Sequence, residues 1–267
     1  MSKHGSARAV LAGAAIAATL ALAGCGGVPK GTKPDVPGEN AGGTGAASAT
    51  SRLSAPLTTR SNTLQGAAAK SFAKAKSIPF PVAVGNTWIY QTRADGQTGR
   101  TTNRIVAAGP GSGGYRVTVS STTDVGGSAS TVVPVYTFYP NGTVGYPVPP
   151  VSSVPVTGTA IRWPDAAGLA SGKIYHSTLH IPGGDAHVTV QGAGTTSVSV
   201  PAGTYRASVV KTTITAQGQN IEVTVWIAQG TGPVKTEVVI RAPGGTGLTT
   251  SDLLSFTKAA SVIGDGS

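Results

Sequence analysis

The chain is short of several residue types, and each shortage limits what the protein can be. Cysteine occurs once among the 267 residues, at Cys25, so no internal disulfide can form and stability must come from core burial. Charged residues make up only 11% of the chain, with 10 acidic residues against 20 basic ones, and histidine occurs four times. Sites that need several carboxylates, thiols or imidazoles therefore have few places to form.

Common catalytic motifs are also missing. No G-x-S-x-G nucleophile elbow occurs, and glycine clusters such as residues 109–114 do not join a strand to a helix as a phosphate-binding loop does. Six carboxylates of the C-terminal two thirds are dispersed and do not form convincing pairs: Asp124, Asp165, Asp185, Glu222, Glu237 and Asp252. The sequence predicts a protein that is not an enzyme and that has no cofactor.

Residues 1–24 have the layout of an export signal. Lys3 and Arg8 precede the apolar run 9–22, which is shorter than the roughly 20 residues of a membrane-spanning helix. The segment Leu22-Ala23-Gly24-Cys25 resembles the lipobox of bacterial lipoproteins. This resemblance implies cleavage before Cys25 and acylation of its thiol with diacylglycerol and acyl chains such as palmitate, which anchors the protein to the outer face of the cell membrane. The alternative is a plain secretory signal that is cut elsewhere.

Residues 25–77 are predicted to be a flexible basic tether. Their Gly, Ala, Ser, Thr and Pro content cannot bury enough apolar surface to offset the entropy of ordering. The tether carries seven Lys and Arg against two Asp and Glu, while residues 78–267 have a net charge of only +3. The basic residues near the anchor suit anionic lipid headgroups, and no basic-aromatic motif favours nucleic acid.

Residues 78–267 are predicted to form a single β-rich domain. In the stretch 198–240, proline and glycine at 201–204 mark a turn, residues 205–216 favour a strand, and 217–220 form a polar loop. Ile221, Val223, Val225 and Ile227 then alternate with polar residues or Trp226, so this set should face a core. The pattern predicts an antiparallel meander.

The first half of this domain shows the same rhythm of strands and glycine turns. Strands are expected at residues 84–92, 101–107, 115–122 and 131–139. The dipeptide Asn141-Gly142 predicts a hairpin with a type I′ turn, and Pro147–Pro155 should be an edge or a long loop. The expected fold is therefore all-β, with a single antiparallel meander that forms a curved sheet.

Three short segments carry a resemblance to a protein family. They read VGNTWIY at 84–90, VPAGTY at 200–205 and GTGPVKTE at 230–237. Together they resemble a pattern in uncharacterised bacterial lipoproteins, whose domains are similar to the open β-half-barrel of lipoprotein-localisation factors and related lipid carriers. The resemblance implies an open half-barrel whose concave face binds an apolar or amphiphilic ligand.

The residues predicted to line that concave face are aromatic: Trp88, Tyr90, Trp163 and Trp226. Aromatic residues on strands are also ordinary core residues, which is the plainer interpretation. A second hypothesis is an interaction module that binds an envelope protein or a cell-wall polymer through an exposed edge or the proline-rich loop.

A histidine hairpin gives a third hypothesis. If Gly183-Gly184 forms the tip, His180 faces His187 across the ladder, and His176 lies two positions away on the same face. Two or three imidazoles at that spacing can bind Zn²⁺ or Cu²⁺, although no carboxylate is clearly placed to orient the rings. A polar, solvent-facing strand surface explains the same pattern.

Overall fold

The computed structural model describes residues 80–259, except for 112, 147–156, 159–160 and 182–183. The export signal 1–24, Cys25, the tether 25–77 and the predicted loop Pro147–Pro155 lie outside the described residues. Within them, fourteen strands form one sheet. The first seven are β1 (Thr87–Ala94), β2 (Gln97–Gly111), β3 (Gly114–Val125), β4 (Ser128–Val132), β5 (Val135–Phe138), β6 (Val144–Tyr146) and β7 (Thr157–Gly158). The others are β8 (Ile161–Trp163), β9 (Ile174–Ile181), β10 (Gly184–Val200), β11 (Gly203–Ala216), β12 (Gln219–Ala228), β13 (Gly232–Ala242) and β14 (Gly245–Thr257).

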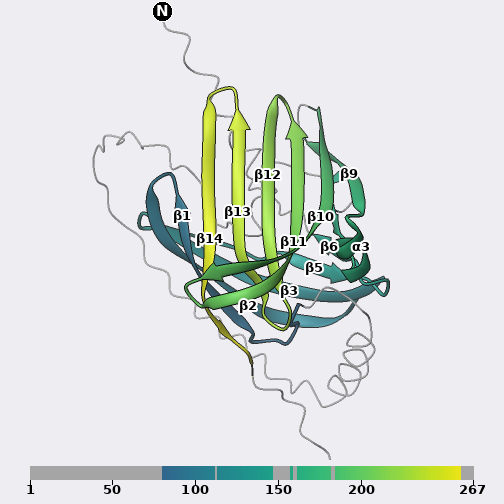
Figure 1. Ribbon diagram of the computed structural model, residues 1–267, viewed down its shortest axis with the longest axis vertical. Helices are drawn as coiled ribbons and strands as arrows, with labels where there is room; N and C mark the ends of the chain where they lie inside the picture. Colours follow the sequence, from purple (N-terminus) through teal and green to yellow (C-terminus); the bar gives the residue numbers. More distant parts are fainter. Residues whose placement is uncertain (1–79, 112, 147–156, 159–160, 182–183, 260–267) are drawn as a thin grey trace, which may run out of the picture.

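The sheet is an antiparallel meander that curls into a nearly closed barrel (Figure 1). Strands β9 to β14 follow one another, β14 pairs with β1, and the order continues through β2, β3, β5, β6 and β8. Strand β4 pairs with β3 beside this path, and the short β7 pairs with β9. Because β8 lies against β9 and β10, the two edges of the sheet approach each other. The predicted all-β meander is confirmed, and its curvature goes beyond a half-barrel.

Four register shifts account for part of this curvature. They lie in the β1–β14 pair at Leu254, in the β2–β3 pair at Val106, in the β10–β11 pair between Gly192 and Thr195, and in the β12–β13 pair at Val234. An extra residue on one strand bends that strand and increases the local twist, which is how a long antiparallel sheet closes on itself. The long hairpin of β10 and β11 runs beyond its neighbours, and its tip meets β14, where Ala202 N donates to Leu253 O at 2.9 Å.

The inside of the barrel is the hydrophobic core. In β12, Ile221, Val223, Val225 and Ile227 are buried as predicted, and the alternate residues are partly exposed. Trp88 and Tyr90 share one buried face of β1, also as predicted. Period-two alternation therefore decides which residues meet inside the barrel.

Two local predictions were wrong. The strand expected at 131–139 is divided into β4 and β5 by Val133-Pro134, because proline has no N–H to donate to the ladder. Instead, the carbonyl oxygen of Pro134 accepts a hydrogen bond from Val119 N at 2.9 Å. The hairpin predicted at Asn141-Gly142 does form, between β5 and β6, but its turn is not type I′, because only Gly142 has a positive φ, of 83°. Asn141 Oδ1 stabilises the turn by accepting from Thr143 N at 3.1 Å.

One short helix, α3 (Ala166–Ser171), connects β8 to β9. Asp165 caps its N-terminus by accepting from Gly168 N, and the buried Leu169 packs the helix against the barrel wall at β10 and β11. In the described part of the chain, no helix has the length and hydrophobicity needed to cross a membrane.

Candidate functional site

The two aromatic residues of the VGNTWIY segment bond directly to the GTGPVKTE segment. Trp88 Nε1 donates to Thr231 O at 2.5 Å, and Tyr90 OH donates to Pro233 O at 2.9 Å. Gly232 lies between the two acceptors with φ +88°, a conformation that side chains with a β-carbon rarely adopt. A β-carbon at this position would also lie 3.5 Å from Trp88 Nε1. The two segments that carry the family resemblance therefore form one structural joint.

An aromatic cluster surrounds this joint. The Phe80 ring centroid lies 5.4 Å from that of Trp88, 6.2 Å from that of Tyr136 and 5.8 Å from that of Phe138. The Trp88 ring stacks on Phe256 with centroids 5.1 Å apart. These are preferred distances for aromatic pairs, which add to the stabilisation from burial. The cluster fills the end of the barrel at which the described chain begins and ends.

A small cavity lies among these side chains. Its lining comes from the segment before β1 and from β1, β2, β3, β5, β8, β12, β13 and β14: Phe80, Trp88, Tyr90, Asn103, Val119, Tyr136, Trp163, Val225, Pro233, Thr236 and Ser251. Its free volume is about 30 Å³, which is room for one or a few water molecules. Sites for drug-sized ligands are about ten times larger or more. Trp88, Tyr90 and Trp163, three of the four residues predicted from the sequence, are in the lining.

Trp226, the fourth predicted residue, is outside the set that lines the cavity. It alternates with the core residues of β12 and is partly buried on the other face of that strand. The Lys235 ammonium lies 5.5 Å from the centroid of its ring. Such a contact between a cation and an aromatic face contributes about 0.5–1 kcal/mol at an exposed site.

The polar groups buried in the barrel are uncharged. Hydroxyls of Thr92, Thr101 and Thr123 form a chain across β1, β2 and β3, with Oγ1–Oγ1 distances of 2.8 and 2.9 Å, and Thr92 also meets Ser251 at 3.1 Å. Asn103 Oδ1 is buried without a hydrogen-bond partner among the described residues. This acceptor belongs to a residue of the cavity lining.

The two buried tyrosines of the cavity stay protonated at neutral pH. Burial raises the pKa of Tyr90, and a hydrogen bond from Asn103 offsets only part of this effect. Burial also raises the pKa of Tyr136 well above its usual value, with a smaller contribution from the nearby Tyr90. Both phenols can therefore act as hydrogen-bonding groups but not as bases at neutral pH.

The predicted register of the histidine hairpin was wrong. His180 pairs with Asp185 instead of His187, while His187 pairs with Thr178 and Thr189 with His176. His180 Nδ1 lies 2.8 Å from Asp185 Oδ1, so a carboxylate does orient this ring. In the described ranges, no group of three or more His, Cys, Asp and Glu is arranged to hold a metal ion. The metal hypothesis for His176, His180 and His187 loses the pairing on which it was based.

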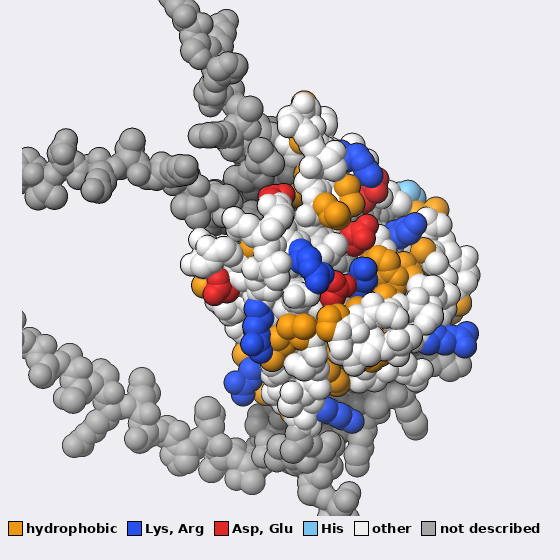
Figure 2. Space-filling view, turned by 60° about the vertical axis from the view of Figure 1, so that its left-hand side comes forward, with side chains coloured by type: hydrophobic (Ala, Val, Ile, Leu, Met, Phe, Trp, Pro, Cys, Tyr) orange, Lys and Arg blue, Asp and Glu red, His pale blue; other side chains and the backbone are white. Residues whose placement is uncertain are grey.

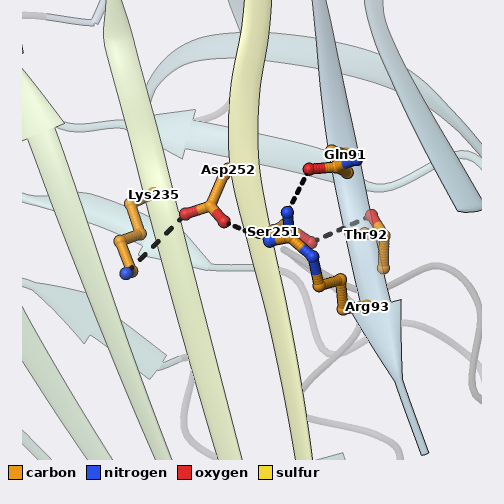
Figure 3. Close-up of polar contacts among 6 residues, drawn as sticks. All are labelled: Gln91, Thr92, Arg93, Lys235, Ser251 and Asp252. Atoms are coloured by element: carbon orange, nitrogen blue, oxygen red, sulfur yellow. Dashed lines mark hydrogen bonds and ion pairs between the residues drawn. The ribbon is translucent and has the colours of Figure 1, made fainter. Parts of the chain in front are cut away.

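A polar network crosses the outer face of the barrel where β13, β14 and β1 lie side by side (Figure 3). Asp252 accepts from Arg93 Nη1 at 2.9 Å, and Lys235 Nζ lies 3.7 Å from its other oxygen. Arg93 also donates to Gln91, and Ser251 bonds to Thr92 on the inner side of the same strands. Asp252 is thus held between two cations, which suits a structural role.

Sequence reasoning missed part of the cavity lining. Phe80 and Tyr136 were not proposed, although the alternation of buried and partly exposed residues in β5 is a signal for Tyr136. Asn103 lies on β2 between the buried residues Thr101 and Ile105, a position that alternation assigns to the interior. No local signal distinguishes an asparagine that faces a cavity from one that faces solvent.

Comparisons with known proteins add little about function. No protein-family model matches the chain, and no curated protein matches it by sequence. A crystal structure of a proposed exported protein with a YmcC-like fold, from Bacteroides fragilis NCTC 9343, gives a TM-score of 0.45 at 18% identity and covers 68% of this chain and 100% of its own. A proposed lipoprotein from Parabacteroides distasonis ATCC 8503 gives a TM-score of 0.44 at 15% identity and covers 68% and 99%.

Proposed function

We propose that this protein is an exported envelope lipoprotein whose barrel acts by binding a partner and not by catalysis. The lipobox-like segment Leu22-Ala23-Gly24-Cys25 after a short apolar run supports export and acylation. Two or more acyl chains give durable membrane attachment, where a single chain is marginal. The barrel is then an extracytoplasmic domain on a tether of about fifty residues.

The size of the interior cavity favours an interaction module over a lipid carrier. A free volume of about 30 Å³ does not accommodate an acyl chain of ordinary length, because each methylene needs space comparable to that of a water molecule. The barrel is nearly closed, and its wall residues meet in the core. A packed barrel offers its outer face, edges and loops to a protein or a cell-wall polymer.

The chemistry of the buried groups supports a role without catalysis. The buried polar residues among those described are Asn, Gln, Ser and Thr, and none is ionisable. Described carboxylates lie towards the outside, where Asp252, Asp185 and Glu222 are in ion pairs. A general acid or base working near neutral pH needs an ionisable group with a suitable pKa, and the interior supplies only tyrosines with raised values.

One observation favours a second function, the binding of a small amphiphile inside the barrel. The cavity combines five aromatic side chains with Asn103 Oδ1, an acceptor that has no partner among the described residues. Apolar walls with a few directed polar groups are typical of ligand sites. For a lipid to enter, the wall around Trp163 on the edge strand β8 would have to move outwards.

Crosslinking in intact envelopes tests the proposed module. An amine-reactive crosslinker should join the protein to a reproducible partner, with crosslinked peptides that contain the outward lysines Lys211 or Lys235. The anchor is tested on the same material, because acylation at Cys25 adds the mass of a diacylglycerol to the first peptide of the mature chain. Absence of specific crosslinks, together with a co-purifying lipid, would favour the amphiphile carrier instead.

A further inference from the structure

Three valines are exposed together where the regular strands are interrupted. Val84 is 52% exposed, Val106 46% and Val133 56%. Val84 precedes β1, Val106 is the extra residue in β2, and Val133 lies in the break between β4 and β5. Exposed valines are common singly, so the position of these three relative to one another and to nearby charge decides whether they matter.

Backbone hydrogen bonds place the three valines at one level of the barrel. Gly85 N donates to Ile105 O at 2.8 Å, which brings Val84 beside Val106. On the other side, Ile105 pairs with Val119, and Val119 N donates to Pro134 O at 2.9 Å. The valines therefore span three neighbouring strand spacings, or about 15 Å.

Two unpaired arginines accompany these valines. Arg104 and Arg116 are exposed on β2 and β3, and neither has an ion-pair partner among the described residues. The sequence from 80 to 164 contains only two acidic residues, Asp95 and Asp124, and both belong to the end of β1–β3 away from the valines. The lower part of Figure 2 likewise shows Lys and Arg beside hydrophobic side chains, and no Asp or Glu of the described chain is visible there.

The same end of the barrel receives the tether. Asn86 is fully buried, its Nδ2 donates to Pro81 O at 3.1 Å, and its Oδ1 accepts from Ala259 N at 2.8 Å. One asparagine thus fixes both ends of the described chain next to Val84. The exposed Lys258 adds a further cation at this place. A chain anchored by Cys25 and leading into Phe80 therefore joins the barrel at this end.

We propose that Val84, Val106 and Val133 with Arg104 and Arg116 form a docking face for an anionic lipid membrane. The proposal builds on the lipid anchor of the proposed function, since the anchor keeps the domain near the bilayer. The valines enter the headgroup region, and the arginines meet lipid phosphates. Each arginine near an anionic membrane strengthens binding about fivefold, and each buried valine contributes a similar factor. The anchor makes such weak contacts effective, because it holds the face at high local concentration.

Site-specific fluorescence on the acylated full-length mature protein tests the docking face. When Cys25 is acylated its thiol is consumed, so Val106→Cys or Val133→Cys supplies the reactive thiol for an environment-sensitive dye. Leu248→Cys is the matched control, because Leu248 is also 52% exposed but lies nine residues from the end of β14, about 30 Å away. The protein is inserted into vesicles of phosphatidylcholine with phosphatidylglycerol, some carrying brominated acyl chains.

The expected result is a blue shift and quenching by brominated lipid at positions 106 and 133, but not at 248. Replacing Arg104 and Arg116 by Gln should weaken the signal at least fivefold, and pure phosphatidylcholine should do the same. Equal signals at all three positions would overturn the docking face, as would a blue shift that depends on protein concentration and not on lipid, which would indicate contact between two copies. Failure of the anchor is separate, because a chain without acylation is also labelled at Cys25 and does not stay with the vesicles.

Discussion

Trp88 and Thr231 are 143 positions apart in the chain, and the indole Nε1 of one donates to the carbonyl oxygen of the other at 2.5 Å. The bond joins β1 to the turn that leads into β13, across the end of the barrel. Because Trp88 is only 1% exposed, the bond is shielded from water. The segments VGNTWIY and GTGPVKTE therefore join β1 to the turn between β12 and β13 at one end of the barrel.

Replacing Trp88 by Phe tests the importance of this joint. The change removes the donor and leaves the Thr231 carbonyl without it, so the free energy of unfolding should fall by about 2–4 kcal/mol from the lost bond and the smaller ring. Urea unfolding followed by circular dichroism gives the value. Trp226→Phe on the outer face is the control and should cost less than about 1 kcal/mol. Equal losses in the two variants would show that the joint has no special role.

Gly232→Ala tests the turn between the two acceptors. At φ +88° a β-carbon is strained, and the variant should lose about 1–2 kcal/mol of stability. Gly247→Ala in β14 is the matched control, because nothing lies within 4 Å of its added β-carbon and its φ is not in the positive range. Thermal melting of both variants should separate them by several degrees. A control that melts lower than Gly232→Ala would contradict the assigned role.

Stability should fall steeply in alkaline solution because of Tyr90 and Tyr136. Burial raises the pKa of both phenols in the folded state above the usual 10.0. Below pH 10 both states carry the protons, and the stabilisation is complete. Above it the unfolded chain ionises first, so the free energy of unfolding should drop by about 1.4 kcal/mol per pH unit for each tyrosine.

Urea titrations between pH 9 and 11.5 measure this slope. Tyr136→Phe removes one phenol with a raised pKa and should make the slope about 1.4 kcal/mol per pH unit shallower, whatever its effect on stability at neutral pH. Tyr115, whose pKa burial also raises, keeps its own contribution in this variant. An unchanged slope in this variant would mean that Tyr136 ionises as easily in the folded barrel as in the unfolded chain.

The His180–Asp185 pair should contribute little to stability. The side chains are 61% and 50% exposed, so water and salt screen their attraction. A double-mutant cycle with His180→Ala and Asp185→Ala should give a coupling energy below about 1 kcal/mol that decreases in 1 M salt. A larger coupling that resists salt would point to a constrained, functional histidine instead.

The sequence predicted the type of fold better than the details of the site. Alternation placed Trp88, Tyr90 and the apolar residues of β12 correctly, because burial follows a simple period of two. The same alternation separates Trp226 from Val225, which explains why Trp226 lies away from the cavity. The closing of the sheet into a barrel could not be predicted, since it depends on extra residues such as Val106 and Leu254 that have no local signature in the sequence.

The histidine register shows a second limit. Two adjacent glycines, Gly183 and Gly184, are equally good turn residues, so sequence spacing alone allows more than one pairing. The register that occurs places Asp185 opposite His180, and the two side chains lie within hydrogen-bond distance of each other. This register separates His180 from His187 in the ladder and changes the expected chemistry from a metal site to a hydrogen-bonded His–Asp pair.

The most direct test of the packed-barrel account is mass spectrometry of residues 78–267, exported without the lipid anchor from a native-like host. Native spectra give the mass of the folded domain, and organic extracts reveal any bound molecule. The account predicts the mass of the empty chain and extracts that match a blank purification. A lipid or glycolipid that co-purifies near one to one, and is lost in Asn103→Ala or Trp163→Ala, would contradict it and identify the barrel as a carrier.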